Sequence, residues 1–120
     1  GGTSWGWIEA QRHPTARLQR LGETFAQWGI PTPLAIQQCR QVWSEGLIIA
    51  SGGVRSGLDA AIAIALGADA VSIAQPLLKP ALESTQAVID ELETWMMELK
   101  IAMFCCGART IEELKQIEVQ

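Results

Sequence analysis

The residues best suited to chemistry are two glycines and an arginine that directly follow a short apolar run. The run, residues 47–50, has the length and the isoleucine content of a β-strand. It ends in the segment SGGVR, residues 51–55, where the missing Cβ atoms let the backbone turn tightly and let a ligand approach the main chain. A phosphate dianion suits the donors of this turn. These donors are the main-chain N–H groups of Gly52, Gly53 and Val54 and the guanidinium of Arg55.

A helix is expected to begin directly after this turn. Ser56 can cap it, Asp59 follows three residues later, and Gly67 ends it. The N-terminus of this helix then points at the turn, where the helix dipole favours an anion. The alternative is an ordinary glycine-rich turn in which the side chain of Arg55 pairs with Asp59. We favour the phosphate site.

A second apolar strand, Ala70–Ala74, follows the helix and ends at Gln75. Together these segments predict a right-handed βαβ unit with two parallel strands. Because the carboxyl ends of parallel strands meet at one edge, Ala74 and Gln75 should lie beside the glycine turn. The loop Gly1–Trp5 is expected to leave an earlier strand at the same edge. Its alternative is a tight turn capped by Ser4, with Trp5 as a packing residue.

The flanking segments continue the alternation of helices and strands, which predicts an α/β barrel or a doubly wound fold. The expected elements are a short helix over Trp5–Arg12, a polar loop over His13–Leu21, a helix over Leu34–Glu45 capped by Thr32, and a helical turn from Pro76 that Pro80 breaks. A long helix capped by Ser84 or Thr85 should run to Cys106 and end at Gly107, and a last helix should begin in the capping box at Thr110. The apolar stripe of the helix over Leu34–Glu45 is formed by Ala35, Ile36, Cys39, Val42 and Trp43, and Glu98 lies off the apolar stripe of the long helix.

The composition argues against several classes of function. The chain has 120 residues, a formal charge of −4 and 48% hydrophobic residues. An acidic chain without a cluster of basic residues is not expected to bind nucleic acid, and no apolar run reaches the ~18–20 residues of a membrane span. Three cysteines, two of them adjacent, fit free thiols in the cytoplasm better than a disulfide framework. With one histidine, His13, they cannot build a four-ligand metal site.

One parallel pair of strands cannot stand alone, because both faces and both edges need cover. The chain also begins at Gly1, without methionine. We therefore expect residues 1–120 to be one partial domain of a longer chain whose N-terminal part is missing. No nucleophile–base pair and no carboxylate pair lies near a strand end, so catalysis must come from a cofactor or from the missing part.

The segment ASGGVRSGLDAAIAIALGADAVSIA, with GGTSW before it and GART after it, resembles the C-terminal part of type 2 isopentenyl-diphosphate Δ-isomerase. That family is an FMN-dependent (β/α)8 barrel, and the similarity includes the WGIPTP helix start. The resemblance implies that the chain is the C-terminal portion of a TIM barrel, with the last βα units and the C-terminal helices. It also implies interconversion of isopentenyl and dimethylallyl diphosphate, with reduced FMN as the acid/base.

The resemblance assigns the binding residues one by one. Thr3 matches a threonine that contacts the flavin, and Trp5 matches a tryptophan near the hydrocarbon end of the substrate. The segment 53–55 matches the glycine-x-arginine segment on the FMN phosphate. Ala74 and Gln75 match the pair after the last strand, although Gln75 replaces a more usual glycine. The full set of expected cofactor-binding residues is Thr3, Gly52, Gly53, Val54, Arg55, Ala74 and Gln75.

The resemblance further implies NADPH as the reductant of FMN and Mg²⁺ on the diphosphate, with ligands outside these 120 residues. The piece alone should not turn over, and we expect a homo-oligomer. One alternative is an FMN-dependent 2-hydroxy-acid oxidase, but such enzymes usually carry His-Gly-Gly-Arg and Gly-Arg motifs where this chain has GGTSW and AQP. Another is a non-catalytic phosphate-binding module that associates through its exposed sheet edge.

Overall fold

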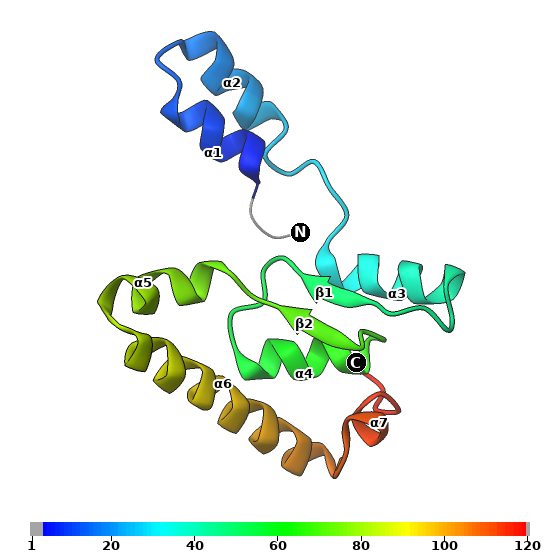
Figure 1. Ribbon diagram of the computed structural model, residues 1–120. Helices are drawn as coiled ribbons and strands as arrows, with labels where there is room; N and C mark the ends of the chain where they lie inside the picture. The colour runs from blue at the N-terminus through cyan, green and yellow to red at the C-terminus, as the bar shows by residue number, and fades with distance from the viewer. Residues whose placement is uncertain (1–3, 120) are drawn as a thin grey trace.

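The computed structural model describes residues 4–119 (Figure 1). The predicted mixed α/β class is confirmed for these residues, and the strands in them form a two-stranded parallel sheet rather than a closed barrel. The elements in chain order are α1 (Trp5–Arg12), α2 (Ala16–Thr24), α3 (Thr32–Val42), β1 (Ile49–Ser51), α4 (Gly57–Ala65), β2 (Ala70–Ser72), α5 (Gln75–Glu83), α6 (Thr85–Cys106) and α7 (Ile111–Leu114).

The βαβ unit lies at the centre of the fold, as predicted. β1 and β2 pair in parallel, with Ser51 opposite Ser72, and α4 connects them. On one face of this pair, Ala50 packs with Ile36 of α3 and Ala63 of α4. Successive side chains of a strand point to opposite faces, and Ile49 on the other face is 57% exposed. The helices therefore cover only one face of the sheet.

The long helix α6 packs against α4 and has the predicted ends. Ser84 accepts a hydrogen bond from the N–H of Ala87 at 3.0 Å, and Gly107 ends the helix with a φ of 79°. The inward stripe of α6 places Trp95 against Val54, next to the glycine turn. The turn is therefore held from the side of the C-terminal helices.

The last helix begins in the predicted capping box. The hydroxyl of Thr110 accepts from the N–H of Glu113 at 3.1 Å. The carboxylate of Glu113 in turn accepts from the N–H of Arg109 at 2.6 Å, one residue before the cap. Leu114 is thereby buried in a cluster with Ala61 of α4.

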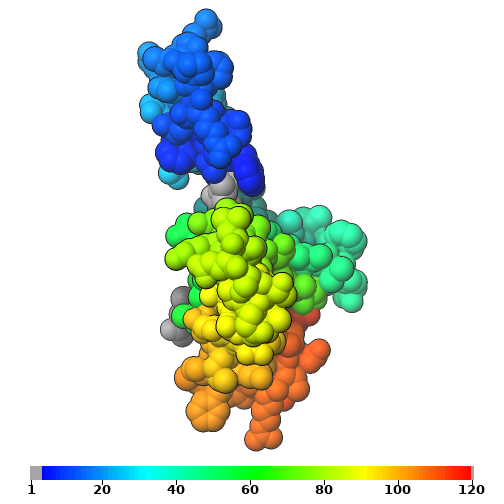
Figure 2. Space-filling model, turned by 60° about the vertical axis from the view of Figure 1, so that its left-hand side comes forward, coloured from blue at the N-terminus to red at the C-terminus, as the bar shows by residue number. Residues whose placement is uncertain are grey.

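Helices α1 and α2 form a hairpin that projects away from the sheet (Figures 1 and 2). Gly22 of α2 approaches α1 so closely that a Cβ there would lie 2.1 Å from the Cβ of Ala10. Trp28, which follows the hairpin, is 82% exposed. The radius of gyration is 17.0 Å, whereas a compact domain of this length has about 14 Å. The described chain is thus open rather than spherical.

Two predicted segments differ from the structure in the N-terminal half. The expected polar loop over His13–Leu21 contains most of α2, because Leu18 and Leu21 recur at helical spacing and line a pocket against α1. The helix expected to reach Glu45 ends at Val42, which is 90% exposed. Of its predicted apolar stripe, only Ile36 is buried.

Three further expectations are wrong in detail. Pro80 does not break the helix after β2, because α5 continues through it to Glu83. The proline ring costs the helix one main-chain hydrogen bond, and the helix tolerates this loss. Thr32 does not cap α3, whose N-cap position is Pro31. The strands are also displaced or shorter than predicted, because β1 is Ile49–Ser51 and β2 is Ala70–Ser72.

Candidate functional site

The glycine turn lies between the end of β1 and the start of α4. Gly52 and Gly53 have φ values of 95° and 78°, in the left-handed region that favours glycine. The next residue, Val54, is buried against Ala60 and Trp95, which anchors the turn on the helices. Within residues 4–119, no acceptor takes the main-chain N–H of Gly53 or Val54. Two adjacent amide donors are therefore available to an anion.

Arg55 supplies the positive charge of the turn. Its side chain is exposed and forms no ion pair with any other residue in the described range. Asp59 accepts a hydrogen bond from the main-chain N–H of Arg55 at 2.9 Å, and its own N–H donates to Ser56 at 3.1 Å. The alternative in which the guanidinium pairs with Asp59 is therefore not observed, and the guanidinium stays available for a ligand.

The start of α4 contributes less to anion binding than the sequence indicated. The carboxylate of Glu98 accepts from the N–H of Gly57 at 2.6 Å, and a Cβ at Gly57 would lie 2.1 Å from the carbonyl oxygen of Trp95. Together with Asp59, Glu98 places two carboxylates at the positive end of the helix dipole. The turn amides and Arg55, rather than the helix dipole, must therefore attract the anion.

The end of β2 lies beside the glycine turn. Because Ser51 pairs with Ser72, the residues that follow them leave the sheet at the same edge, and neighbouring strands are about 5 Å apart. α5 begins at Gln75, after Ala74, and no side chain caps it. Pro76 has no N–H and Leu77 donates to the carbonyl oxygen of Ala74 at 3.1 Å, so among the first three residues of α5 it is Gln75 that offers a main-chain donor at this edge. The structure thus brings together the predicted residues Gly52, Gly53, Val54, Arg55, Ala74 and Gln75.

The first predicted loop contributes less. Thr3 lies outside the described residues. The hydroxyl of Ser4 accepts from the N–H of Trp7 at 3.4 Å and so caps α1. Trp5 is the first residue of α1 and is 72% exposed, so it is not the packing residue of the alternative interpretation. Helix α1 belongs to the hairpin that projects away from the sheet in Figure 1.

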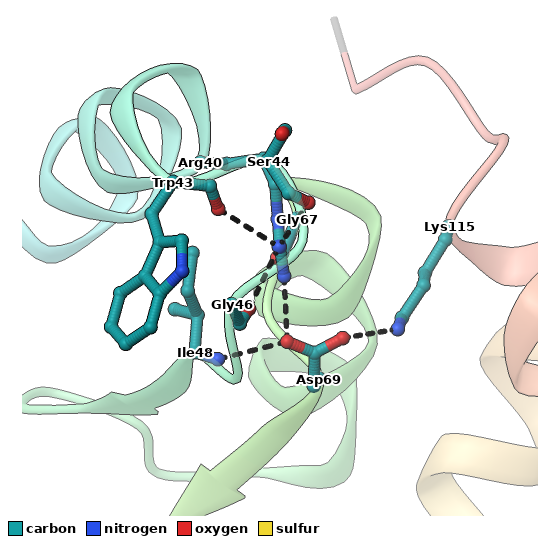
Figure 3. Close-up of polar contacts among 8 residues, drawn as sticks. All are labelled: Arg40, Trp43, Ser44, Gly46, Ile48, Gly67, Asp69 and Lys115. Carbon is teal, nitrogen blue, oxygen red and sulfur yellow. Dashed lines mark hydrogen bonds and ion pairs between the residues drawn. The ribbon is translucent and has the colours of Figure 1, made fainter.

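A charge network that sequence reasoning missed lies at the opposite ends of the strands (Figure 3). Asp69, just before β2, accepts from Lys115 at 2.5 Å, from Arg40 at 2.6 Å and from the N–H of Ile48 at 2.8 Å. These hydrogen bonds hold the pKa of the Asp69 carboxyl well below its usual range, and the one from Lys115 has the largest effect. No local pattern signals this cluster, because its members are 21 to 46 residues away from Asp69.

Other chemical features are sparse in the part of the chain that the structure describes. Cys39, Cys105 and Cys106 are free and exposed. Among residues 4–119, no three His, Cys, Asp or Glu side chains come together in a way that could hold a metal ion. None of the helices described there is long and apolar enough to cross a membrane.

Comparison with known families assigns the chain by its sequence. The FMN-dependent dehydrogenase family matches residues 29–120, which include both strands and the glycine turn. The chain belongs to this family. The FMN-dependent dehydrogenase assignment agrees with a turn that offers main-chain N–H groups and a free arginine to a phosphate.

Curated relatives of this chain include isomerases. The isopentenyl-diphosphate delta-isomerase of Methanocaldococcus jannaschii is 48% identical over 97% of this chain, and that of Mycobacterium marinum is 48% identical over 99%. The chain covers 32% and 33% of these two proteins, about a third of their length. The resemblance to the isomerases that the GGTSW and SGGVR motifs predicted is thus confirmed.

Solved structures with a similar fold include mandelate oxidase. A crystal structure of mandelate oxidase with (S)-2-phenylpropionate matches 77% of this chain with a TM-score of 0.73 and 26% sequence identity. The match covers 28% of the oxidase chain. The arrangement of strands and helices is therefore that of one part of a larger α/β enzyme.

Proposed function

We propose that this chain is the C-terminal part of an isomerase that interconverts isopentenyl diphosphate and dimethylallyl diphosphate. The observation that carries the proposal is the 48% identity to the Methanocaldococcus jannaschii isomerase over 97% of the chain. Residues 1–120 would form the last βα units and the C-terminal helices of a (β/α)8 barrel. The uncovered face of β1 and β2, which carries Ile49, would then line the barrel interior.

In this proposal, FMN binds with its phosphate at the glycine turn. The N–H groups of Gly53 and Val54 and the guanidinium of Arg55, which have no partner within residues 4–119, fit a dianion. Reduced FMN supplies the acid/base group for allylic proton transfer, while the turn holds and orients the cofactor. The other proposed contacts to FMN are those of Thr3, Gly52, Ala74 and Gln75, and Trp5 is proposed to lie near the hydrocarbon end of the substrate.

The remaining components complete the same proposal. NADPH would reduce the flavin, and Mg²⁺ would hold the diphosphate through ligands outside these 120 residues. We also propose a cytoplasmic homo-oligomer. The 120 residues alone would bind the FMN phosphate without turning over substrate, because the part that the structure describes carries two strands and a (β/α)8 barrel needs eight.

A 2-hydroxy-acid oxidase is the second candidate, and the mandelate oxidase match favours it. Such an enzyme needs a base that takes a proton from the hydroxy acid. The single histidine, His13, lies between α1 and α2, where its Nδ1 accepts from the N–H of Thr15 at 3.2 Å. His13 is exposed and does not follow a strand, and the higher identity to the isomerases favours the first candidate.

The proposed reaction is tested on the full-length protein that contains these 120 residues. The protein is incubated anaerobically with FMN, NADPH, Mg²⁺ and isopentenyl diphosphate, and the reaction is followed by proton NMR. Formation of dimethylallyl diphosphate would support the isomerase. Bleaching of oxidised flavin by mandelate or lactate, without any isomer, would assign the chain to the oxidases. A defined oligomer that does not bind flavin would instead indicate the non-catalytic phosphate-binding module.

A further inference from the structure

We infer that Thr32 is a positioning residue for the phosphate group: its hydroxyl holds the glycine turn in the conformation that leaves the turn amides free. The inference rests on the proposed FMN site. Thr32 is the first residue of α3 and is 20 residues away from the turn in sequence. Its side chain donates to the carbonyl oxygen of Gly52 at 2.7 Å, with the carbonyl oxygen of Ser51 at 3.4 Å.

The planarity of the peptide group gives this hydrogen bond its effect. The carbonyl of Gly52 and the N–H of Gly53 belong to one trans peptide unit, so they point in opposite directions. A hydroxyl that holds the carbonyl on the side of α3 therefore directs the N–H of Gly53 away from α3. Asp59 acts in the same way from α4, because its bond to the N–H of Arg55 holds the peptide unit that follows Val54.

The turn needs this support because its two adjacent glycines do little to restrict the backbone conformation. Glycine populates positive and negative φ about equally, so the peptide unit between Gly52 and Gly53 can rotate and reverse its N–H. A pocket of about 100 Å³ also lies against the turn, between α3 and α4. Thr32, Gly52, Gly53 and Asp59 are among its lining residues. The polar contacts of Thr32 and Asp59, rather than dense packing, thus hold the turn from this side.

The test compares the affinities for FMN and riboflavin in the full-length protein that contains these residues. The substitution Thr32→Val keeps the shape of the side chain and removes the hydrogen-bond donor. We expect the affinity for FMN to fall about three- to tenfold, the effect of one neutral hydrogen bond. Riboflavin, which lacks the phosphate, should bind with unchanged affinity. Thr32→Ser keeps a hydroxyl and should restore FMN binding. The ³¹P resonance of bound FMN should shift in Thr32→Val and return in Thr32→Ser.

The outcomes separate this inference from the proposed function. If the unsubstituted chain binds FMN no more tightly than riboflavin, the phosphate site itself is wrong. If it prefers FMN and Thr32→Val keeps the same preference, the positioning role is wrong while the FMN site stands. An equal loss of both flavins in Thr32→Val, or a loss of FMN that Thr32→Ser does not restore, would show a general structural role and overturn the inference.

Discussion

Asp59 accepts a hydrogen bond from the main-chain N–H of Arg55 at 2.9 Å and does not pair with its guanidinium. One carboxylate thus shapes the turn without neutralising the charge that the turn presents. Asp59 therefore has two distinct effects on the turn, one from its oxygen as a hydrogen-bond acceptor and one from its negative charge. Its oxygen supports the peptide unit, whereas its negative charge opposes a bound dianion.

Substitution of Asp59 can test this separation. Asp59→Asn keeps an oxygen acceptor and removes the charge, so the FMN affinity should stay within about threefold of the unsubstituted chain or become tighter. Asp59→Ala removes the acceptor as well and should weaken FMN binding. Flavin fluorescence titration measures both. An equal loss in the two variants would show that the charge, and not the acceptor, is what the turn requires.

Arg55 should contribute the largest single share of phosphate binding. Arg55→Ala removes a charged donor, so we expect the FMN affinity to fall about 10- to 100-fold and riboflavin binding to stay unchanged. Arg17→Ala is the matched control, because Arg17 is exposed on α2 and has no ion pair among the described residues. Equal FMN affinity for the Arg55 and Arg17 variants would remove Arg55 from the site.

Gly57 should not tolerate a side chain. A Cβ there would lie 2.1 Å from the carbonyl oxygen of Trp95 and 2.6 Å from the main-chain nitrogen of Leu99. Gly57→Ala should therefore force α4 and α6 apart and destabilise the protein by about 3 kcal/mol. Gly6→Ala is the control, because a Cβ at Gly6 meets nothing within 4 Å and alanine favours a helix. Thermal denaturation of the full chain measures both, and similar melting temperatures for the two variants would contradict this packing.

The network around Asp69 should stabilise the fold in a pH-dependent way. Its pKa is lower in the folded state than its ordinary value of 3.8, so its contribution is present above that value and is lost as the pH falls toward the folded-state pKa. Asp69→Asn should lower the melting temperature by several degrees at pH 7, and the difference should shrink below about pH 4. Glu93→Gln, at an exposed position of α6, should change little at either pH. A difference that is constant from pH 7 to pH 3 would contradict the role of the Asp69 charge.

The features that could be predicted from the sequence depend on contacts within a few residues. The caps at Ser56, Ser84, Gly107 and Thr110 are all confirmed, because each one satisfies main-chain groups of its own helix turn. The glycine turn and the parallel pair were predictable for the same reason, since an apolar run, a glycine pair and a capped helix follow one another directly. The family resemblance added the identity of the cofactor, which no local pattern specifies.

The contacts that adjust the site could be found only in the tertiary structure. Thr32 reaches Gly52 across 20 residues, Glu98 reaches Gly57 across 41, and Lys115 reaches Asp69 across 46. In the sequence, Thr32 suggested a helix cap and Glu98 a position off the apolar stripe of α6. The sequence by itself therefore determined where the turn lies and which donors it offers. Packing of α3, α4 and α6 decided which of these donors stay free, because a hydrogen bond between distant segments depends on where folding brings them and leaves no periodic mark in the chain.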